Sequence, residues 1–183
     1  IDFGISNTDL AILDKEKVSF YSASSQSAEI NNDTIKDIFK KYNIDISCVE
    51  IIGVTGGKSS DVDDYLEDIT IVKINEIEAI GLGAKKLYGI DDDSTLVVSA
   101  GTGTACVHVQ GNNFNHLGGI AVGGGMLEGL GSLLFNNSHG LEINEFAQKG
   151  SRAELDLLIG DVVNKIGKLY PDITDVKFSQ ARH

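Results

Sequence analysis

Glycine is concentrated in one stretch of this sequence. Of the 21 glycines among 183 residues, ten lie between Gly101 and Gly131. Glycine lets backbone N–H groups approach a ligand closely, and a helix N-terminus beside such a segment favours an anion. Pro171 is the single proline, so the composition differs from that of a disordered linker, which usually carries proline as well. The clustering therefore predicts folded loops that bind an anionic group such as phosphate.

Composition and charge narrow the class of protein. With 42% hydrophobic and 23% charged residues, the chain is typical of a globular protein of one or two compact domains. It holds no apolar run of the roughly 18–20 residues that a membrane span requires and no secretory signal, so no membrane partner is expected. A net charge of -12 argues against nucleic acid and anionic lipid as partners.

The cysteines, histidines and clustered acids indicate no metal centre. Cys48 and Cys106 lack the spacing of a zinc site or a disulfide framework, which favours a reducing, cytoplasmic setting. No ligand spacing links His108, His139 and His183, and the acidic residues within 61–68 are interpreted as a solvated face.

Hydrophobic periodicity predicts an α/β protein with mixed sheets, because hairpins are interspersed with helices. A hairpin is expected within 1–13, a helix over 32–42 capped by Asp33 or Thr34, and a further helix after the glycines at 123–125. The remaining expected strands are 18–21, 48–54, 69–74, 95–100 and 105–110, and the remaining helices are 76–88 and 153–168. A boundary near 88–94 predicts two domains, 1–90 and 91–183. No closing element is recognisable at the end, so the chain is expected to be part of a longer one.

Three glycine-containing junctions, at 4–8, 101–104 and 123–125, are candidate phosphate loops, and two common templates do not fit them. The run ending in Gly57, Lys58 and Ser59 would be a Walker A loop only with glycine at position 52, which is Ile52. The glycine runs that start at Gly81 and Gly101 end on Lys86 and Cys106 and so complete no dinucleotide fingerprint. A P-loop enzyme and a Rossmann dehydrogenase are thereby disfavoured.

Two loops on separate lobes fit a nucleotide clamp better. One contains Asp2, Phe3 and Gly4, and the other runs from Ala100 to Thr104. This pattern resembles the superfamily of acetate and sugar kinases, heat-shock chaperones and actin. That resemblance implies a two-lobed actin-like ATPase fold with ribonuclease-H-like lobes, of which the C-terminal part is missing here. Residues 1–90 would form the first, incomplete lobe, and 91–183 the second lobe with the glycine-rich ATP and substrate loops.

The second half of the chain narrows the resemblance to one family. Val98–Thr104, which ends in Gly-Thr-Gly-Thr, is followed by the glycine-rich stretch His116–Gly131, and together they look like the type II pantothenate kinases. The likeness extends to Thr55–Gly57, Glu76–Ala79 and Phe146–Gly150. It implies an enzyme that uses ATP and Mg²⁺ to phosphorylate pantothenate to 4'-phosphopantothenate, the first step of coenzyme A biosynthesis. It also implies a homodimer, with helices in 125–168 at the interface, and acyl-CoA as a possible feedback ligand.

The resemblance assigns roles to particular residues. Glu76 matches the family's catalytic carboxylate, which orients or deprotonates the attacking hydroxyl, and Glu78 is the weaker candidate. Asp2 would hold Mg²⁺ through water and contribute to ATP binding. His116 stands where the family has an arginine on the substrate side. The remaining expected ATP-binding residues are Gly4, Ser6, Asn7, Thr8, Gly101, Thr102, Gly103, Thr104, Gly124, Gly125, Met126, Leu127 and Glu128.

Two departures from the family pattern keep other functions open. The first loop has Ile5 in place of a second glycine and Asp9 in place of lysine, which removes a positively charged phosphate partner. His116 lacks the forked contacts that an arginine would make with a substrate. One alternative is therefore an ATPase of the same fold that acts as an activator or phosphorylates another small molecule. A non-catalytic module that binds a nucleotide or acyl-CoA is the other.

Overall fold

The structure is a computed structural model that describes residues 1–25, 29–92, 94–163 and 170–177. The chain divides into two compact units, residues 1–126 and 127–183, and each is described here by itself. Among the described residues, no helix combines the length and the apolar character needed to cross a membrane.

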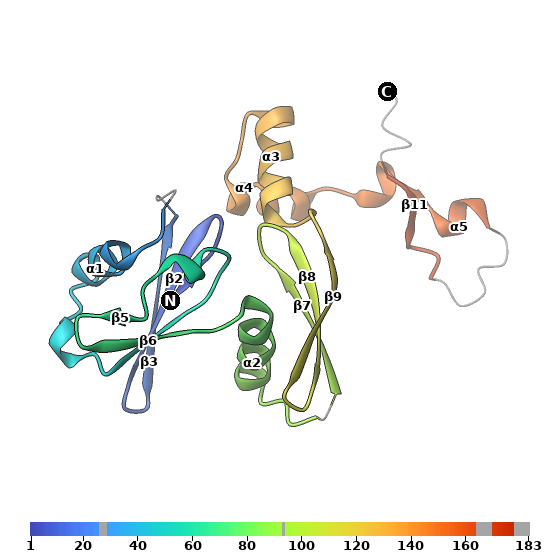
Figure 1. Ribbon diagram of the computed structural model, residues 1–183. Coiled ribbons are helices and arrows are strands. Elements are labelled where there is room, and N and C mark those ends of the chain that lie inside the picture. The colour runs from blue at the N-terminus through green and yellow to red at the C-terminus, as the bar shows by residue number, and fades with distance from the viewer. Residues whose placement is uncertain (26–28, 93, 164–169, 178–183) are drawn as a thin grey trace. The chain divides into compact units, whose positions relative to one another are not determined.

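The first unit begins with two small sheets, β1–β3 and β4–β6 (Figure 1). Strands β1 (Asp2–Phe3), β2 (Asn7–Asp14) and β3 (Lys17–Ser24) pair antiparallel in that order. In the second sheet β6 (Ile69–Lys73) lies between β4 (Ile51–Val54), to which it is parallel, and β5 (Tyr65–Leu66), to which it is antiparallel. A parallel bridge between Asp2 and Thr55 links the two sheets. The predicted α/β class with mixed strand pairing is confirmed.

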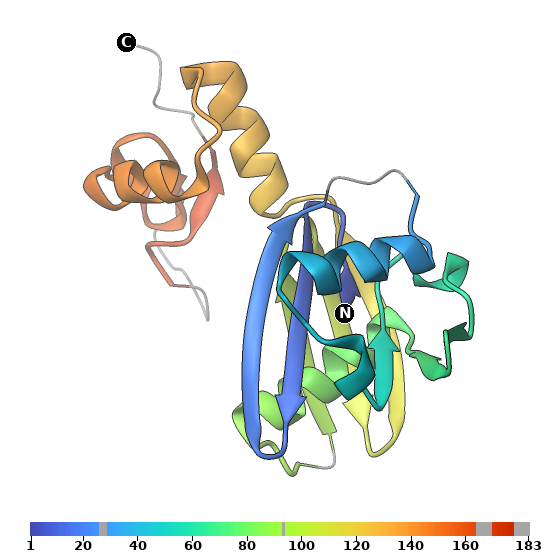
Figure 2. The same cartoon turned by 90° about the vertical axis from the view of Figure 1, so that its left-hand side faces the viewer.

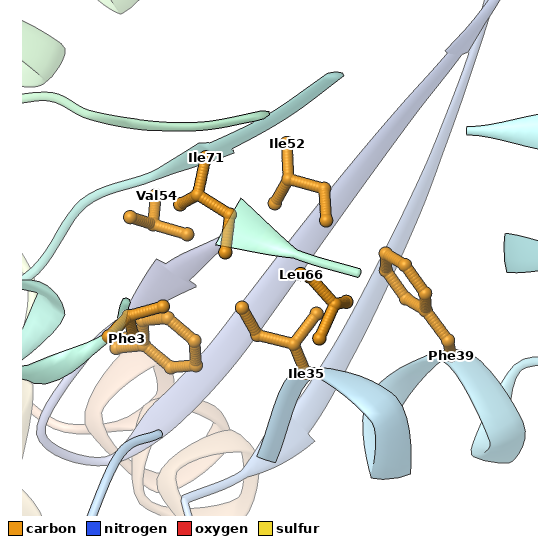
Figure 3. Packing of buried hydrophobic residues seen from close by; sticks show 8 residues of the cluster. Phe3, Ile35, Phe39, Ile52, Val54, Leu66 and Ile71 are labelled. Atoms are coloured by element: carbon orange, nitrogen blue, oxygen red, sulfur yellow. The ribbon is translucent and has the colours of Figure 1, made fainter. Parts of the chain in front are cut away.

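Helix α1 (Asn32–Lys41) supplies two residues of the buried core of this part, Ile35 and Phe39. Figure 2 shows α1 crossing one face of the β2–β3 hairpin. The predicted helix is confirmed, but the predicted cap is wrong, because Asn31 caps it by accepting hydrogen bonds from the N–H groups of Asp33 and Thr34. Ile35 and Phe39, one helical turn apart, pack among the buried side chains that Figure 3 shows. The buried cluster consists of Phe3, Ile35, Phe39, Ile52, Val54, Val62, Leu66 and Ile71. Short 3-10 turns at Ile46–Cys48 and Ser59–Asp61 complete this part.

The rest of the first unit is an antiparallel sheet with a helix packed on it. Its strands are β7 (Ser94–Ala100), β8 (Thr104–Gln110) and β9 (Asn113–Ile120), in sequence order. Helix α2 (Glu76–Tyr88) matches the predicted range and contacts this sheet through Gly81, where a β-carbon would lie 2.6 Å from the Phe114 ring. These contacts cross the domain boundary expected near residue 90, which stays a prediction. Strand β9 was not predicted, because glycines and polar residues interrupt its apolar pattern.

The second unit contains two helices and a small strand pair. Most of α3 (Gly124–Phe135) belongs to it, and α4 (Gly140–Lys149) packs on α3 at Gly131, where a β-carbon would lie 2.5 Å from Ile143. Strand β10 (Leu157–Leu158) pairs antiparallel with β11 (Thr174–Val176), and α5 (Ile159–Val162) follows β10 directly.

The prediction of one helix over 153–168 is wrong for the described part of that range. The chain there forms a 3-10 turn at Arg152–Glu154, strand β10 and the four-residue α5, while 164–169 lie outside the described residues. Asp156 is buried and accepts a hydrogen bond from the Thr174 hydroxyl (2.8 Å), beside the β10–β11 pairing. These contacts with a distant segment override the local helical periodicity.

Truncation of Ile35 should test the core of the first unit. We expect Ile35→Ala to lower the free energy of unfolding by about 3 kcal/mol, because the side chain is 0% exposed and its removal leaves a cavity. Ile51→Ala removes the same atoms from a side chain that is 61% exposed and serves as the control. Urea unfolding of both variants gives the comparison, and equal losses would contradict the placement of Ile35.

Candidate active site

The first two predicted phosphate loops meet in the first unit. The first loop, residues 4–8, connects β1 to β2, and the GTGT loop, residues 101–104, connects β7 to β8. The hydroxyls of Ser6 and Thr102 are joined by a hydrogen bond of 2.8 Å. Residues 96 positions apart in the sequence are thus in direct contact, so the two loops present their backbones at one place.

The third predicted junction is built onto the GTGT loop. The N–H groups of Gly124 and Gly125, at the start of α3, donate to the carbonyls of Gly101 (2.7 Å) and Thr102 (3.2 Å). A β-carbon on Gly123 would lie 2.6–2.7 Å from three carbonyl oxygens of the GTGT loop. Thr104 completes the contact by donating its hydroxyl to the Val122 carbonyl (2.7 Å). Because protein carbonyls satisfy these two helical N–H groups, a phosphate at this junction needs other donors from the loops.

Three carboxylates gather beside the first loop. Asp2 and Asp9 lie directly opposite each other in the β1–β2 pairing. Partial burial raises the pKa of Asp2, and the nearby charges of Glu76 and Asp9 raise it further. Glu76 is the first residue of α2, whose N-cap Asn75 accepts a hydrogen bond from the N–H of Ile77 (2.9 Å). The structure therefore brings Asp2 and Glu76 together, and it adds Asp9 as an acidic neighbour.

The loop after β4 is fastened to the strand that precedes the first loop. Thr55 donates its N–H to the Ile1 carbonyl and accepts from the N–H of Phe3, each at 2.9 Å. Gly56 follows with a φ of +98°, and a β-carbon there would lie 2.4 Å from the Phe3 carbonyl oxygen. Only glycine fits this close approach without strain. The contacts of Thr55 and Gly56 thus fix where the next residues, Gly57 and Lys58, leave the sheet.

Two pockets flank the first loop. One, of about 460 Å³, is lined by both aspartates and Thr55, whose buried side-chain oxygen has no hydrogen-bond partner among the described residues. The other, of about 390 Å³, lies between the β2–β3 hairpin and α1, and Gly4, Thr8 and Lys58 line it. The sequence interpretation did not assign roles to Thr55 or Lys58, although their place directly after a buried strand is a usable signal.

The remaining residues that the sequence predicted for the site do not all lie at the contact between the first loop and the GTGT loop. Thr8 shares a hydrogen bond between hydroxyls with Ser25 (3.1 Å), and Asn7 begins β2. His116 lies on β9 opposite Val107 and is exposed, just before a bulge in the β8–β9 pairing. Met126 is the last residue of the first unit, whereas Leu127 and Glu128 belong to the second, where the Glu128 carboxylate lies beside Gly140.

A pair of glycine substitutions tests the contact between the GTGT loop and the segment before α3. We expect Gly123→Ala to destabilise the protein by about 2 kcal/mol or more, because its methyl group would overlap three carbonyl oxygens. Gly129→Ala lies within α3 with nothing within 4 Å of the added carbon, so it should stabilise by about 0.5–1 kcal/mol. Chemical denaturation of both variants checks this, and a stabilised Gly123→Ala protein would contradict the packing.

The acidic cluster predicts a pH-dependent stability. Because the pKa of Asp2 is raised above 3.8, the folded state holds the proton of Asp2 more tightly than the unfolded state does. The free energy of unfolding therefore falls as pH rises from 3.8 through the pKa of Asp2 in the folded protein. We expect Asp2→Asn to be more stable than the natural protein at neutral pH and equal to it once Asp2 is protonated. Asp14→Asn, at the far end of the same hairpin, is the control. Thermal unfolding across this pH range measures both, and a destabilised Asp2→Asn at neutral pH would contradict the repulsion.

Comparison with known proteins finds a matching family model, similar curated sequences and a solved structure that aligns with part of the chain. Residues 85–175 match the Fumble family. The chain is 32% identical over 171 residues to the type II pantothenate kinase of Bacillus cereus strain AH820 and 33% identical to that of Bacillus thuringiensis subsp. konkukian. Each alignment covers 91% of this chain and 59% of the relative. The solved structure of the Lmo2764 protein from Listeria monocytogenes aligns with 13% identity and a TM-score of 0.48, covering 80% of this chain and 69% of that one.

Because each alignment covers 91% of this chain, the match extends over both halves and includes Glu76 and the glycine-rich segment between Gly101 and Gly131. The family resemblance inferred from the sequence motifs is confirmed. The chain is related to the type II pantothenate kinases along most of its length, and it spans about three fifths of theirs.

Proposed function

We propose that the protein to which this chain belongs is a kinase that transfers the terminal phosphate of ATP to pantothenate. The observation that carries the proposal is the placement of Glu76 beside Asp2, next to two glycine loops that the Ser6–Thr102 hydrogen bond joins. The names of the relatives in Bacillus supply the substrate class. The chain spans about three fifths of their length, so the activity of the whole protein is part of the proposal.

Glu76 is the residue that would act on the attacking hydroxyl. Its carboxylate is exposed at the first turn of α2 and can accept a hydrogen bond from a primary alcohol. A carboxylate in this position orients the hydroxyl toward the phosphate and takes its proton as the new bond forms. Phosphoryl transfer needs little more from the protein than such positioning and the neutralisation of charge.

The donors around the first loop fit a magnesium ion. Mg²⁺ prefers oxygen ligands, keeps several of its waters and is commonly held by one or two carboxylates together with phosphates. Asp2 offers such a carboxylate, and its pKa is raised by partial burial and then by the charges of Glu76 and Asp9, which a cation would offset. The Thr55 hydroxyl lines the same pocket and has no hydrogen-bond partner among the described residues. When bound, the ion would neutralise phosphate charge. Among the described residues, no three Asp, Glu, His or Cys side chains are arranged so that they could hold one metal ion together, so water and phosphate would complete its coordination.

The nucleotide would be held chiefly by the loops. Backbone N–H groups of Gly4–Thr8 and Gly101–Thr104 are the candidate phosphate donors, together with the hydroxyls of Ser6 and Thr102. Residues 124–128 would contribute from the start of α3, and exposed His116 would contact the substrate. A homodimer through the helices after residue 125, acyl-CoA as a feedback ligand and a cytoplasmic location are proposals that follow from the family relation.

Charge removal at Glu76 tests the mechanism. We expect Glu76→Gln to lower kcat for pantothenate phosphorylation by about 10²-fold or more, since the amide cannot accept the proton. Glu78→Gln makes the same change two residues along the exposed start of α2 and should leave kcat within about twofold. The measurement is formation of phosphopantothenate by the full-length protein with ATP and Mg²⁺. Undiminished turnover in Glu76→Gln would refute the assigned role.

Asp9 favours a second candidate function. Its position opposite Asp2 places two negative charges where a terminal phosphate would approach, which is a poor arrangement for rapid transfer. The same site could then serve an ATPase that acts as an activator, or a kinase of another small alcohol. ATP hydrolysis that pantothenate does not stimulate would favour this reading over the first.

A further inference from the structure

A short series of hydrogen bonds attaches the start of α2 to the strand that leads into the first loop. Thr55, at the end of β4, bonds to the backbone of both neighbours of Asp2. The residue before it continues the series, because the Val54 carbonyl accepts from the N–H of Ile74 (2.8 Å) just beyond the end of β6. Backbone contacts therefore hold the chain up to two residues before Glu76.

Asn75 supplies the next link, between this strand end and the helix. Its side-chain oxygen accepts a hydrogen bond from the N–H of Ile77 (2.9 Å), and its carbonyl accepts from the N–H of Ala79 (2.9 Å). Its ψ of 138° lies outside the helical range, so the chain turns into α2 at this residue. Glu76 therefore occupies the first position of the turn that Asn75 caps.

The position of the Glu76 carboxylate depends on this turn. Among the described residues, no hydrogen bond or ion pair restrains the carboxylate, which is exposed at the start of α2. A group that acts on an attacking hydroxyl must lie within hydrogen-bond reach of it, and a misplacement of about 1 Å can cost about 10²-fold in rate. The backbone of the first turn is what fixes this carboxylate relative to Asp2.

We infer that Asn75 is a positioning residue, which caps α2 and thereby holds the Glu76 carboxylate where it can accept the proton of the attacking hydroxyl. The inference rests on the proposed function, in which Glu76 is the base. Asn75 itself takes no part in the chemistry, because its side chain acts through the backbone N–H of Ile77.

The caps of α1 and α2 give a matched test. We expect Asn75→Ala to lower kcat for pantothenate phosphorylation by the full-length protein about fivefold, equivalent to about 1 kcal/mol. The KM values for ATP and pantothenate should stay within about twofold, because the loss falls on the position of Glu76. Asn75→Ser keeps a neutral acceptor oxygen and should restore kcat. Asn31→Ala removes the corresponding cap from α1 and should leave kcat unchanged.

Hydrogen exchange at the Ile77 amide separates positioning from a purely structural role. Measured by NMR, this exchange should accelerate in Asn75→Ala and recover in Asn75→Ser, because Asn75 accepts the hydrogen bond of that amide. Faster exchange with unchanged kcat would overturn the role of Asn75. An equal fall of kcat in Asn31→Ala would overturn it as well, since loss of either cap would then have the same effect.

A second assay distinguishes this inference from the proposed function. It follows ADP formation by the natural protein and by Asn75→Ala, with and without pantothenate. ADP formation that pantothenate does not stimulate would refute the substrate assignment. A fivefold lower rate in Asn75→Ala would in that case still support the positioning of Glu76, which would then act on water, and an equal rate would overturn it. Absence of ATP turnover in the natural protein would overturn both.

Discussion

The backbone contact between the first strand and the end of β4 is the constraint on which the candidate site depends. Thr55 exchanges hydrogen bonds with Ile1 and Phe3, and Gly56 lies so close to Phe3 that no side chain fits between them. This contact joins the two small sheets of the first unit, and it also places the first loop beside the turn that carries Lys58. The same backbone contacts therefore join the two sheets and position the candidate site. A substitution at Gly56 would disturb both the sheet contact and the first loop.

Negative charge is the second organising feature of the site. Asp2, Asp9 and Glu76 come from two strands and a helix; partial burial raises the pKa of Asp2 in the folded protein, and the charges of Glu76 and Asp9 raise it further. Such an arrangement lowers stability and is typical of functional sites, where the unfavourable energy is offset when a cation or substrate binds. The protein's overall charge of -12 adds to the negative potential around these three carboxylates.

The glycine-rich segment shows how much of the site the sequence could predict. The excess between Gly101 and Gly131 indicated close backbone approach, and Gly123 meets three carbonyls of the GTGT loop as that prediction requires. The same excess gave no means of telling Gly123 from Gly129, which has open space around it. Nor did the glycine excess indicate that Gly124 and Gly125 donate their N–H groups to protein carbonyls. These distinctions depend on which segments meet, which spacing along the chain does not reveal.

The sequence by itself determined the α/β class, helices α1 and α2, the antiparallel hairpin at the start and the relation to the type II pantothenate kinases, because periodicity and short motifs are local properties. Only the tertiary structure decided that residues around Asp156 pair with a distant strand instead of forming a long helix, and that Asp9 faces Asp2. It also decided that Lys58 lies at the first loop. Each of these features follows from hydrogen bonds and packing between segments whose meeting is set by the folded chain as a whole.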